Sequence, residues 1–290
     1  MFNLSHSTRI CIDQLKGWPK NPRIYMGLLL GAALVVIPTR NYVFFAVHLN
    51  EPMNILEPFV ILGSLREHMT FILLGLLLIL SDAPFVNQRT TYTIIRTSRK
   101  SWLIGSLMYI FISSAIYYLF ILCISMLVAS YNGFMANFWS DPMYTLSIQR
   151  PNSALTDYGV YFPYSDLIRN LSPLMAVLHT YLLSVAYGAI LSAIMFSVNL
   201  YRGKILGNVA ALGVHATGYI LISEALFTVP KFSLLANSLL GSHSFSGNVT
   251  TPFLLRFSYS LFATIIWVIC LFALFAMKRF DYRISVGDKE

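Results

Sequence analysis

Six long apolar runs, separated by polar segments, dominate the pattern of the chain. A helix needs about 20 mostly apolar residues to cross the hydrocarbon core of a membrane, and the runs are of that order. They cover residues 24–47, 58–80, 102–128, 173–198, 205–227 and 253–277. Polar residues from Pro38 to Asn41 interrupt the first run, so we expect its helical core to be residues 24–37. The pattern predicts an all-α membrane protein, a single domain with six transmembrane helices.

The composition supports this class. Of the 290 residues, 57% are hydrophobic and 11% are charged, whereas a soluble domain carries about 25% charged residues. The net charge of +8 is compatible with nucleic-acid binding, but the basic residues cluster beside the apolar runs, so we expect no nucleic-acid partner. Cys11, Cys123 and Cys270 lie far apart without the spacing of metal ligands, which argues against a disulfide or a zinc site. The first 23 residues are polar and basic, so a removable signal peptide is not expected.

Lysine and arginine are distributed unevenly between alternate connecting segments, and this predicts the orientation. Cytoplasmic segments of membrane proteins carry the excess of these residues. With both termini inside, the cytoplasmic segments hold 14 of the 20, namely Arg9, Lys16, Lys20, Arg23, Arg89, Arg96, Arg99, Lys100, Arg202, Lys204, Lys278, Arg279, Arg283 and Lys289. We therefore expect both termini to be cytoplasmic.

The N-terminal segment, residues 1–23, is expected to contain an interfacial helix. Residues 7–18 have an apolar side and a polar side, as is typical of a helix lying on the membrane surface. Ser7 or Thr8 would cap this helix. Its apolar side would carry Ile10, Cys11, Leu15 and Trp18. The alternative is a disordered basic tail.

Two connections on the outer side are long. Residues 129–172 form a loop that is rich in tyrosine and proline. Residues 228–252 contain an apolar stretch, 233–240, that is too short to cross the membrane. Backbone at membrane depth must satisfy its hydrogen bonds within the protein. This stretch therefore predicts a re-entrant or interfacial helix before the last span.

Familiar catalytic motifs are missing from the sequence. It contains no Walker A motif and no HExxH motif. The stretch SFSG at 244–247 lacks the first glycine of the GxSG motif of six-span intramembrane proteases. We therefore expect no catalytic residue, no metal site and no cofactor on this chain.

Ionisable residues within the apolar runs are functional candidates, because their burial in a membrane is costly. Arg66, Glu67 and His68 stand together in the second run. Three consecutive side chains cannot share one helix face, so the helix must break there or line water. We expect the triplet to face a hydrated cavity. His215 is the deepest of the others and is expected to be a neutral, hydrogen-bonded core residue, whereas Glu224 should lie near the outer surface.

Three stretches are distinctive: NILEPFVIL at 54–62, SDAPF at 81–85 and IIRTSRKSW at 94–102. Together with the six-span layout, they resemble ABC-2 type permeases, the membrane subunits of bacterial ABC exporters, in a branch from low-GC Gram-positive bacteria. The resemblance implies a multi-pass protein of the bacterial cell membrane. It also implies a half-transporter, in which two permeases, identical or paralogous, work with two separate cytoplasmic ATPases that bind ATP and Mg²⁺.

The same resemblance assigns roles to segments. The N-terminal helix would be a connecting helix, and residues 81–101 would hold the coupling helix that contacts the ATPase. The implied coupling residues are Asp82, Pro84, Phe85, Arg89, Tyr92, Ile95, Arg96, Arg99 and Lys100. Pro84 suits the first turn of such a helix, and the apolar side chains of this segment have no membrane to enter. The alternative is an ordinary inner loop with positive charge.

Glycines at four-residue spacing let helices approach closely in lipid. Gly27 and Gly31 have this spacing in the first span, and Gly207 lies near the start of the fifth. The spacing indicates either packing within one subunit or an interface between two. Because the first and fifth spans of ABC-2 permeases usually meet across the dimer, the resemblance assigns these three glycines to a dimer interface.

The leading interpretation is therefore the permease subunit of an ATP-driven exporter. Its cargo would be amphipathic or lipophilic, such as a peptide toxin, a bacteriocin, an antibiotic or a lipid-linked molecule. Membrane lipid would surround the permease itself. Two alternatives stay open. A proton-coupled secondary transporter would use His215, Glu67 and Glu224, and a membrane sensor or assembly factor would transport nothing. An ATPase partner distinguishes the first interpretation from the others.

Overall fold

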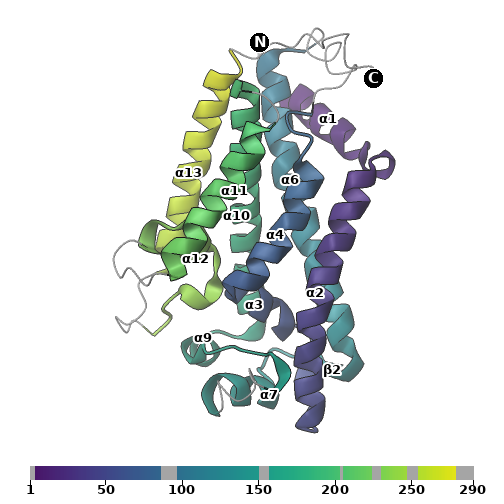
Figure 1. Ribbon diagram of the computed structural model, residues 1–290, viewed down its shortest axis with the longest axis vertical. Coiled ribbons are helices and arrows are strands. Elements are labelled where there is room, and N and C mark those ends of the chain that lie inside the picture. The colour runs from purple at the N-terminus through teal and green to yellow at the C-terminus, as the bar shows by residue number, and fades with distance from the viewer. Residues whose placement is uncertain are drawn as a thin grey trace.

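The computed structural model describes residues 4–85, 97–149, 157–202, 205–223, 230–246 and 254–278, and it is mainly helical (Figure 1). The long helices are α2 (Pro22–His48), α6 (Arg99–Ala129), α10 (Pro173–Arg202), α11 (Leu206–Ser223) and α13 (Leu255–Ala276). The shorter helices include α1 (Leu4–Leu15), α3 (Glu57–Ser64), α4 (Arg66–Leu80), α7 (Asp141–Tyr144), α9 (Ser165–Asn170) and α12 (Leu234–Ser238). Two short strands, β1 (Met53–Asn54) and β2 (Gly133–Phe134), pair in parallel.

Several helices are long and apolar enough to cross a membrane. In the described part of the chain these are α2, α6, α10 and α13, and α3 with α4 also qualifies as a pair, although the two helices are bent by 93°. The helix α11 is apolar but shorter. The described residues therefore hold four candidate spans, or five if the bent pair is one span. This supports a multi-pass, all-α membrane protein, while six spans and the orientation of the termini stay predictions.

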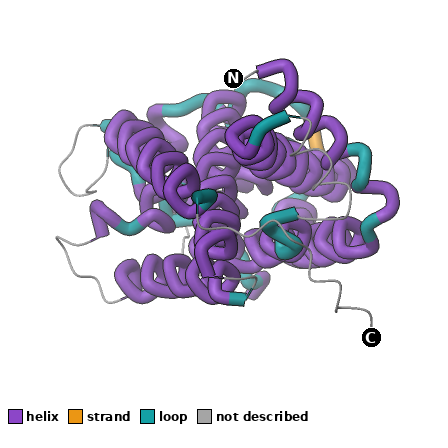
Figure 2. Tube along the Cα trace, turned by 90° about the horizontal axis from the view of Figure 1, so that it is seen from above, coloured by secondary structure: helices purple, strands orange, loops and turns teal. Residues whose placement is uncertain are grey.

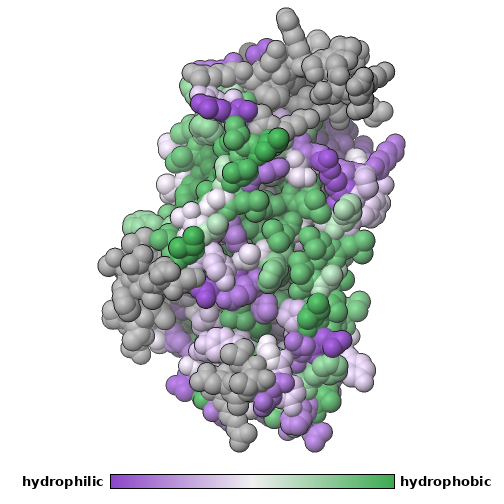
Figure 3. Space-filling view, viewed as in Figure 1, coloured by the Kyte–Doolittle hydropathy of each residue, from purple (hydrophilic) through white to green (hydrophobic). Residues whose placement is uncertain are grey.

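The helices α10 and α6 each contact three of the other long helices. The helix α10 packs against α3, α6, α11, α12 and α13, while α2 packs against α4 and α6. Figure 2, which looks along the long axis, shows the helices side by side. In Figure 3, hydrophobic residues cover much of the face between the two ends of the molecule. A large exposed apolar surface of this kind is typical of a protein in contact with lipid.

The helix α1 packs against α6, at the end of the molecule opposite α7 and α9 (Figure 1). Ile10, which was predicted to lie on the apolar side, is buried against the rest of the protein and does not face the membrane surface. Gly105 of α6 allows the close approach, because a Cβ atom there would lie 2.7 Å from the carbonyl oxygen of Ser7. The predicted cap at Ser7 or Thr8 is wrong, since the helix begins upstream of both and Ser7 is buried within it.

The helix α2 continues through Pro38, so the prediction that its core ends just before this residue is wrong. A proline inside a helix removes one backbone hydrogen bond. The following turns bury Tyr42 and Phe45, and this packing stabilises the continuation. The polar residues after the proline do not end the helix either. Arg40 lies over the Phe44 ring, 5.1 Å from its centroid, on the same helix.

The predicted short helix before the last span is present as α12, although it is shorter than the predicted residues 233–240. The Ser233 hydroxyl caps it by accepting the Ala236 backbone N–H at 3.2 Å. The helix is mostly buried, and it packs against α10, α11 and α13. Its backbone is therefore shielded by protein, as a re-entrant segment requires.

Candidate functional site

The bend between α3 and α4 lies at the charged triplet. Leu65 has an extended backbone (φ −106°, ψ 128°), and α4 begins at Arg66. Arg66 pairs with the Glu67 carboxylate (Nε–Oε1 2.7 Å), and its guanidinium lies 5.0 Å from the ring centroid of Tyr219 on α11. A break was one of the two outcomes that three consecutive polar residues predicted. It directs Arg66 toward α11 and His68 toward α2.

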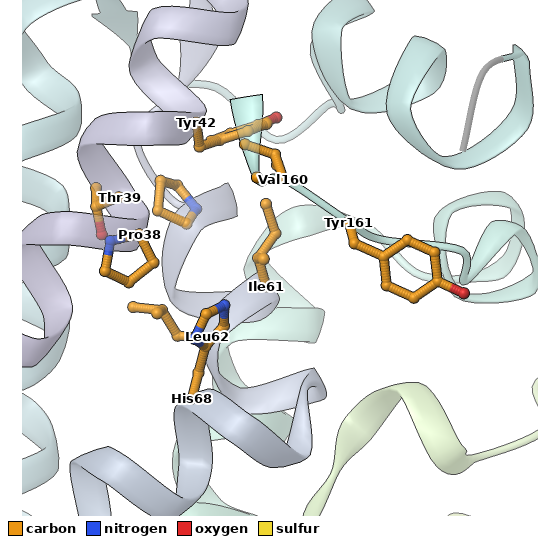
Figure 4. Close-up of a pocket in the computed structure, with 10 residues that line it drawn as sticks. Pro38, Thr39, Tyr42, Ile61, Leu62, His68, Val160 and Tyr161 are labelled. Carbon is orange, nitrogen blue, oxygen red and sulfur yellow. The ribbon is translucent and has the colours of Figure 1, made fainter. Parts of the chain in front are cut away.

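A small cavity lies beside this bend, between α2, α3, α4 and residues 159–161 (Figure 4). Its volume of ≈ 20 Å³ is enough for about one water molecule. The lining residues are Pro38, Thr39, Tyr42, Pro58, Ile61, Leu62, His68, Gly159, Val160 and Tyr161. The Thr39 hydroxyl is buried without a hydrogen-bond partner among the described residues, so it and the His68 ring are suited to bind a water. His68 therefore lines a partly polar cavity, whereas Arg66 and Glu67 do not line this one.

A buried carboxylate joins three segments near this cavity. Glu57, the first residue of α3, is 0% exposed. Its Oε2 accepts hydrogen bonds from the Tyr42 hydroxyl (3.0 Å), the Asn54 backbone N–H (3.2 Å) and the Ser140 hydroxyl (2.6 Å). Its Oε1 accepts the Ser140 backbone N–H at 2.6 Å. Because a buried acid is costly unless it is hydrogen-bonded, this set of donors explains how Glu57 is accommodated.

Asn54 extends this connection. Its Nδ2 donates to the carbonyl oxygens of Ala136 (2.6 Å) and Phe138 (2.9 Å), and its Oδ1 accepts the Leu56 N–H at 3.1 Å. The pairing of β1 with β2 lies beside these bonds, with Asn54 opposite Phe134. The segment NILE at 54–57 therefore holds residues 133–140 through backbone and side chains together. This role was not predicted, although an acid at the start of an apolar run was an available signal.

His215 of α11 is buried and hydrogen-bonded, as predicted. Its Nδ1 lies 2.6 Å from the Tyr187 hydroxyl of α10, and its Nε2 lies 2.9 Å from the Thr70 hydroxyl of α4. Thr70 donates its own hydrogen to the Arg66 carbonyl oxygen at 2.7 Å, so Nε2 must be the donor to Thr70. Nδ1 is then free to accept from Tyr187. This neutral tautomer satisfies the ring while it links three helices.

Of the segment predicted to contact an ATPase, residues 81–101, the structure describes residues 81–85 and 97–101. Residues 81–84 form a turn, so the prediction that Pro84 lies in the first turn of a helix is wrong. Asp82 forms an ion pair with Arg23 of α2 and accepts a hydrogen bond from Asn21 Nδ2 at 3.4 Å. These bonds explain the turn, since the carboxylate contacts α2 instead of capping a helix.

Phe85 is partly buried and packs against aromatic side chains of α6 and α10, and its contact with an ATPase stays a prediction. Its ring centroid lies 5.0 Å from that of Tyr109 and 6.0 Å from that of Phe196. At the other end of the segment, Arg99 and Lys100 are exposed in the first turn of α6. The remaining predicted coupling residues lie outside the described part of the chain, namely Arg89, Tyr92, Ile95 and Arg96.

The three glycines assigned to a dimer interface pack within the chain. A Cβ atom at Gly27 would lie 2.7 Å from the Gly75 carbonyl oxygen of α4. A Cβ atom at Gly31 would collide with Tyr117 of α6, and one at Gly207 would collide with the backbone of α10. The dimer-interface assignment is therefore not supported at these positions. Of the two readings of the four-residue spacing, packing within one subunit is the one observed.

Comparisons with known proteins give no family for this chain. No protein-family model, no curated protein and no solved structure matches it. Within the described residues, no group of three or more His, Cys, Asp or Glu side chains is placed to hold a metal ion.

Proposed function

We propose that this chain is the permease subunit of an ATP-driven exporter, acting as one of two permeases with two separate ATPase subunits. ATP and Mg²⁺ would be bound by the ATPases, and the chain itself would catalyse no covalent reaction. The observation that carries the proposal is an aromatic cluster of Trp18, Phe85, Tyr109 and Phe196. This cluster joins the segment predicted to face the ATPase to three helices.

Tyr109 of α6 connects the parts of the aromatic cluster. Its hydroxyl accepts a hydrogen bond from Trp18 Nε1 at 3.1 Å, just after α1. Its ring meets Phe85 edge-on, with an interplanar angle of 80°. Phe85 also stacks against Phe196 of α10. Because closely packed groups transmit displacement, a movement of the chain at Phe85 would be passed to α6 and α10 and, through Tyr109 and Trp18, to the segment that follows α1.

Two further contacts fix the same end of the molecule. Gln14 Nε2 of α1 donates to the Ser106 hydroxyl of α6 at 3.2 Å. The ion pair of Asp82 with Arg23 connects the turn to α2. The N-terminal helix therefore packs against the first turns of α6, and this contact supports its proposed role as a connecting helix.

In this mechanism, ATP binding would bring the two ATPases together and bias the pair of permeases toward one of two conformations. Access to a cavity between the permeases would change with that conformation. The cargo class, amphipathic or lipophilic molecules, rests on the resemblance to ABC-2 permeases. The roles of Tyr92 and Ile95 as contacts to the ATPase rest on it as well.

Purification of the chain from its native membrane, followed by mass spectrometry, tests the proposal. We expect a separate ABC ATPase to co-purify in a near 1:1 ratio, because each permease would bind one ATPase. The pair Tyr92→Ala with Ile95→Ala should remove it, whereas Phe85→Ala should retain it but lower export per ATP hydrolysed. Phe71→Ala is the control, since this ring is exposed on α4 and outside the aromatic cluster.

Other results would contradict the proposal. If the purified chain without an ATPase moves a solute in response to a pH gradient, it is a proton-coupled transporter. If no ATPase co-purifies and vesicles show no flux, the sensor or assembly role is favoured. If Phe85→Ala and Phe71→Ala behave alike, the aromatic cluster does not couple the segment to the helices.

A further inference from the structure

A groove of ≈ 500 Å³ lies between α11 and the chain that leads into α12. Its α11 wall runs from Ala210 to Leu221, and its other wall is formed by Phe232, Ser233 and Leu234. The volume falls within the ≈ 300–1,000 Å³ that ligand sites usually have. The groove is separate from the bend, the buried carboxylate and the aromatic cluster described above.

Two glycines give the groove its shape. A Cβ atom at Gly218 would lie 3.1 Å from the Leu235 Cβ atom, so this glycine permits α12 to approach α11. A Cβ atom at Gly213 would meet nothing within 4 Å, so this glycine leaves the groove open. The missing side chain at Gly213 therefore creates space that the rest of the described chain does not fill.

The side-chain hydroxyl groups of the groove already donate hydrogen bonds to backbone carbonyl oxygens of the same chain. The Thr217 hydroxyl donates to the Gly213 carbonyl oxygen at 2.8 Å, and the Ser233 hydroxyl donates to the Gly218 carbonyl oxygen at 3.3 Å. The remaining lining is mainly hydrocarbon. An occupant would therefore be held by apolar contact and not by hydrogen bonds, which favours an aliphatic chain.

The groove residue Phe232 belongs to an exposed aromatic pair, and each ring directly follows a basic residue. Phe232 is 72% exposed and meets Phe257 of α13 edge-on, with ring centroids 6.3 Å apart. Lys231 and Arg256, the residues directly before these two rings, are both exposed. They are two of the six basic residues that lie outside the predicted cytoplasmic segments. Basic residues beside an apolar groove are suited to bind the phosphate of a lipid headgroup.

We propose that this groove binds one acyl chain of an anionic phospholipid, whose headgroup phosphate lies beside Lys231 and Arg256. The apolar walls and the two basic residues match the two parts of such a lipid. The neighbouring surface of α11 is also apolar and exposed at Val209, Leu212 and Ile220, so the groove opens next to a surface suited to lipid. This proposal needs only a membrane-embedded chain and does not rest on ATP-driven export.

The test uses the full chain, purified in detergent, delipidated and offered phosphatidylglycerol or phosphatidylcholine with identical acyl chains. Native mass spectrometry counts the lipids that remain bound. Gly213→Trp should fill the groove and remove one lipid of either type, whereas Gly213→Ala should keep it. Leu212→Trp is the matched control, because it adds the same ring to an exposed position of α11 outside the groove.

The two basic residues are tested separately with Lys231→Gln and Arg256→Gln. A basic residue near the membrane surface adds about 1 kcal/mol to the binding of anionic lipid, so each substitution should lower the preference for phosphatidylglycerol about fivefold. Binding of phosphatidylcholine should fall less, because its choline group offsets the charge of the same phosphate. Both side chains are exposed, so these two substitutions should not disturb folding. They therefore still test the proposed lipid site if Gly213→Trp does not fold.

Three results would overturn the proposal. In the first, Gly213→Trp retains as much lipid as the unmodified chain. In the second, Gly213→Trp converts a dimer to a monomer with lipid binding unchanged, which would make the groove an interface between two copies. In the third, the Lys231→Gln and Arg256→Gln variants keep the full preference for the anionic lipid.

Discussion

Replacing Glu57 should destabilise the protein more than replacing any exposed acid, because four hydrogen bonds end on its buried carboxylate. In Glu57→Ala, the N–H groups of Asn54 and Ser140 lose their acceptor, and each unsatisfied buried donor costs ≈ 1–3 kcal/mol. The two hydroxyl donors, on Tyr42 and Ser140, can turn toward other acceptors and contribute less. We therefore expect a loss of about 3–5 kcal/mol, comparable to the breaking of a buried polar pair.

The isosteric variant Glu57→Gln should have a smaller effect. An amide keeps one acceptor oxygen, and its NH₂ group would face the Ser140 N–H if the oxygen takes the position of Oε2. One donor is then left without an acceptor, at a cost of about 1–3 kcal/mol. Ser140→Ala removes one hydroxyl donor and should cost about 1 kcal/mol. The expected order of destabilisation is Glu57→Ala, then Glu57→Gln, then Ser140→Ala.

The assay is thermal unfolding in detergent at one fixed scan rate, because membrane proteins often unfold irreversibly. Glu51→Gln is the control, since Glu51 is exposed six positions upstream and surface substitutions usually change stability by less than about 0.5 kcal/mol. Hydrogen exchange gives a local measure. Peptides covering residues 50–60 and 133–144 should lose protection together in Glu57→Ala. Equal midpoints for Glu57→Ala and Glu51→Gln would refute the reasoning.

Three further predictions use the same unfolding measurement. Gly27→Ala should lower the free energy of unfolding by about 1–3 kcal/mol, because the added Cβ atom would overpack the contact with α4. Gly213→Ala should be neutral or up to about 1 kcal/mol stabilising, and equal unfolding midpoints for the two variants would contradict the packing described. Thr70→Val should leave the Nε2–H of His215 without its acceptor and lower the free energy of unfolding by about 1–3 kcal/mol. Thr70→Ser keeps the hydroxyl and should unfold at the same temperature as the unmodified protein. His243 follows α12 and is buried beside the Ser258 hydroxyl of α13 (Nε2–Oγ 2.8 Å), and burial lowers its pKa from 6.5 to about 4. The free energy of unfolding should therefore be highest above pH 6.5 and fall as the pH drops toward 4, and His243→Gln should flatten this dependence; a parallel profile would contradict it.

The long helices were predictable because their signal is local. The predicted runs 173–198 and 253–277 correspond closely to α10 and α13, since a sustained apolar run of helical length needs no information about partners. Pro38 misled the prediction for α2, because whether a helix continues past a proline depends on what its next turns pack against. That packing comes from residues distant in sequence.

The site residues show the same division. The triplet at residues 66–68 indicated a break or a wet surface from its three consecutive polar residues alone. The role of Glu57 depends on Ser140, 83 positions later, and no short pattern shows that pairing. Gly27 and Gly213 are chemically identical and both lie in apolar helices. Gly27 packs against the backbone of a neighbouring helix, whereas Gly213 faces an open groove. Only the fold distinguishes these two positions.

The two ends of the molecule are held together by different kinds of contact, and this difference bears on the proposed function. Near α7, Glu57 and Asn54 bind backbone groups through short hydrogen bonds, whose strength falls steeply when distance or angle changes. Near α1, the aromatic cluster adds ring contacts at 5.0 and 6.0 Å, which have a broader range of favourable geometries, to the Trp18–Tyr109 hydrogen bond and the Asp82–Arg23 ion pair. Both ends should therefore move as units, while the Phe85 ring can change its angle against Tyr109 and Phe196 without losing contact. The proposed exporter would need this arrangement, because a displacement received at Phe85 would then be passed to the helices as a whole.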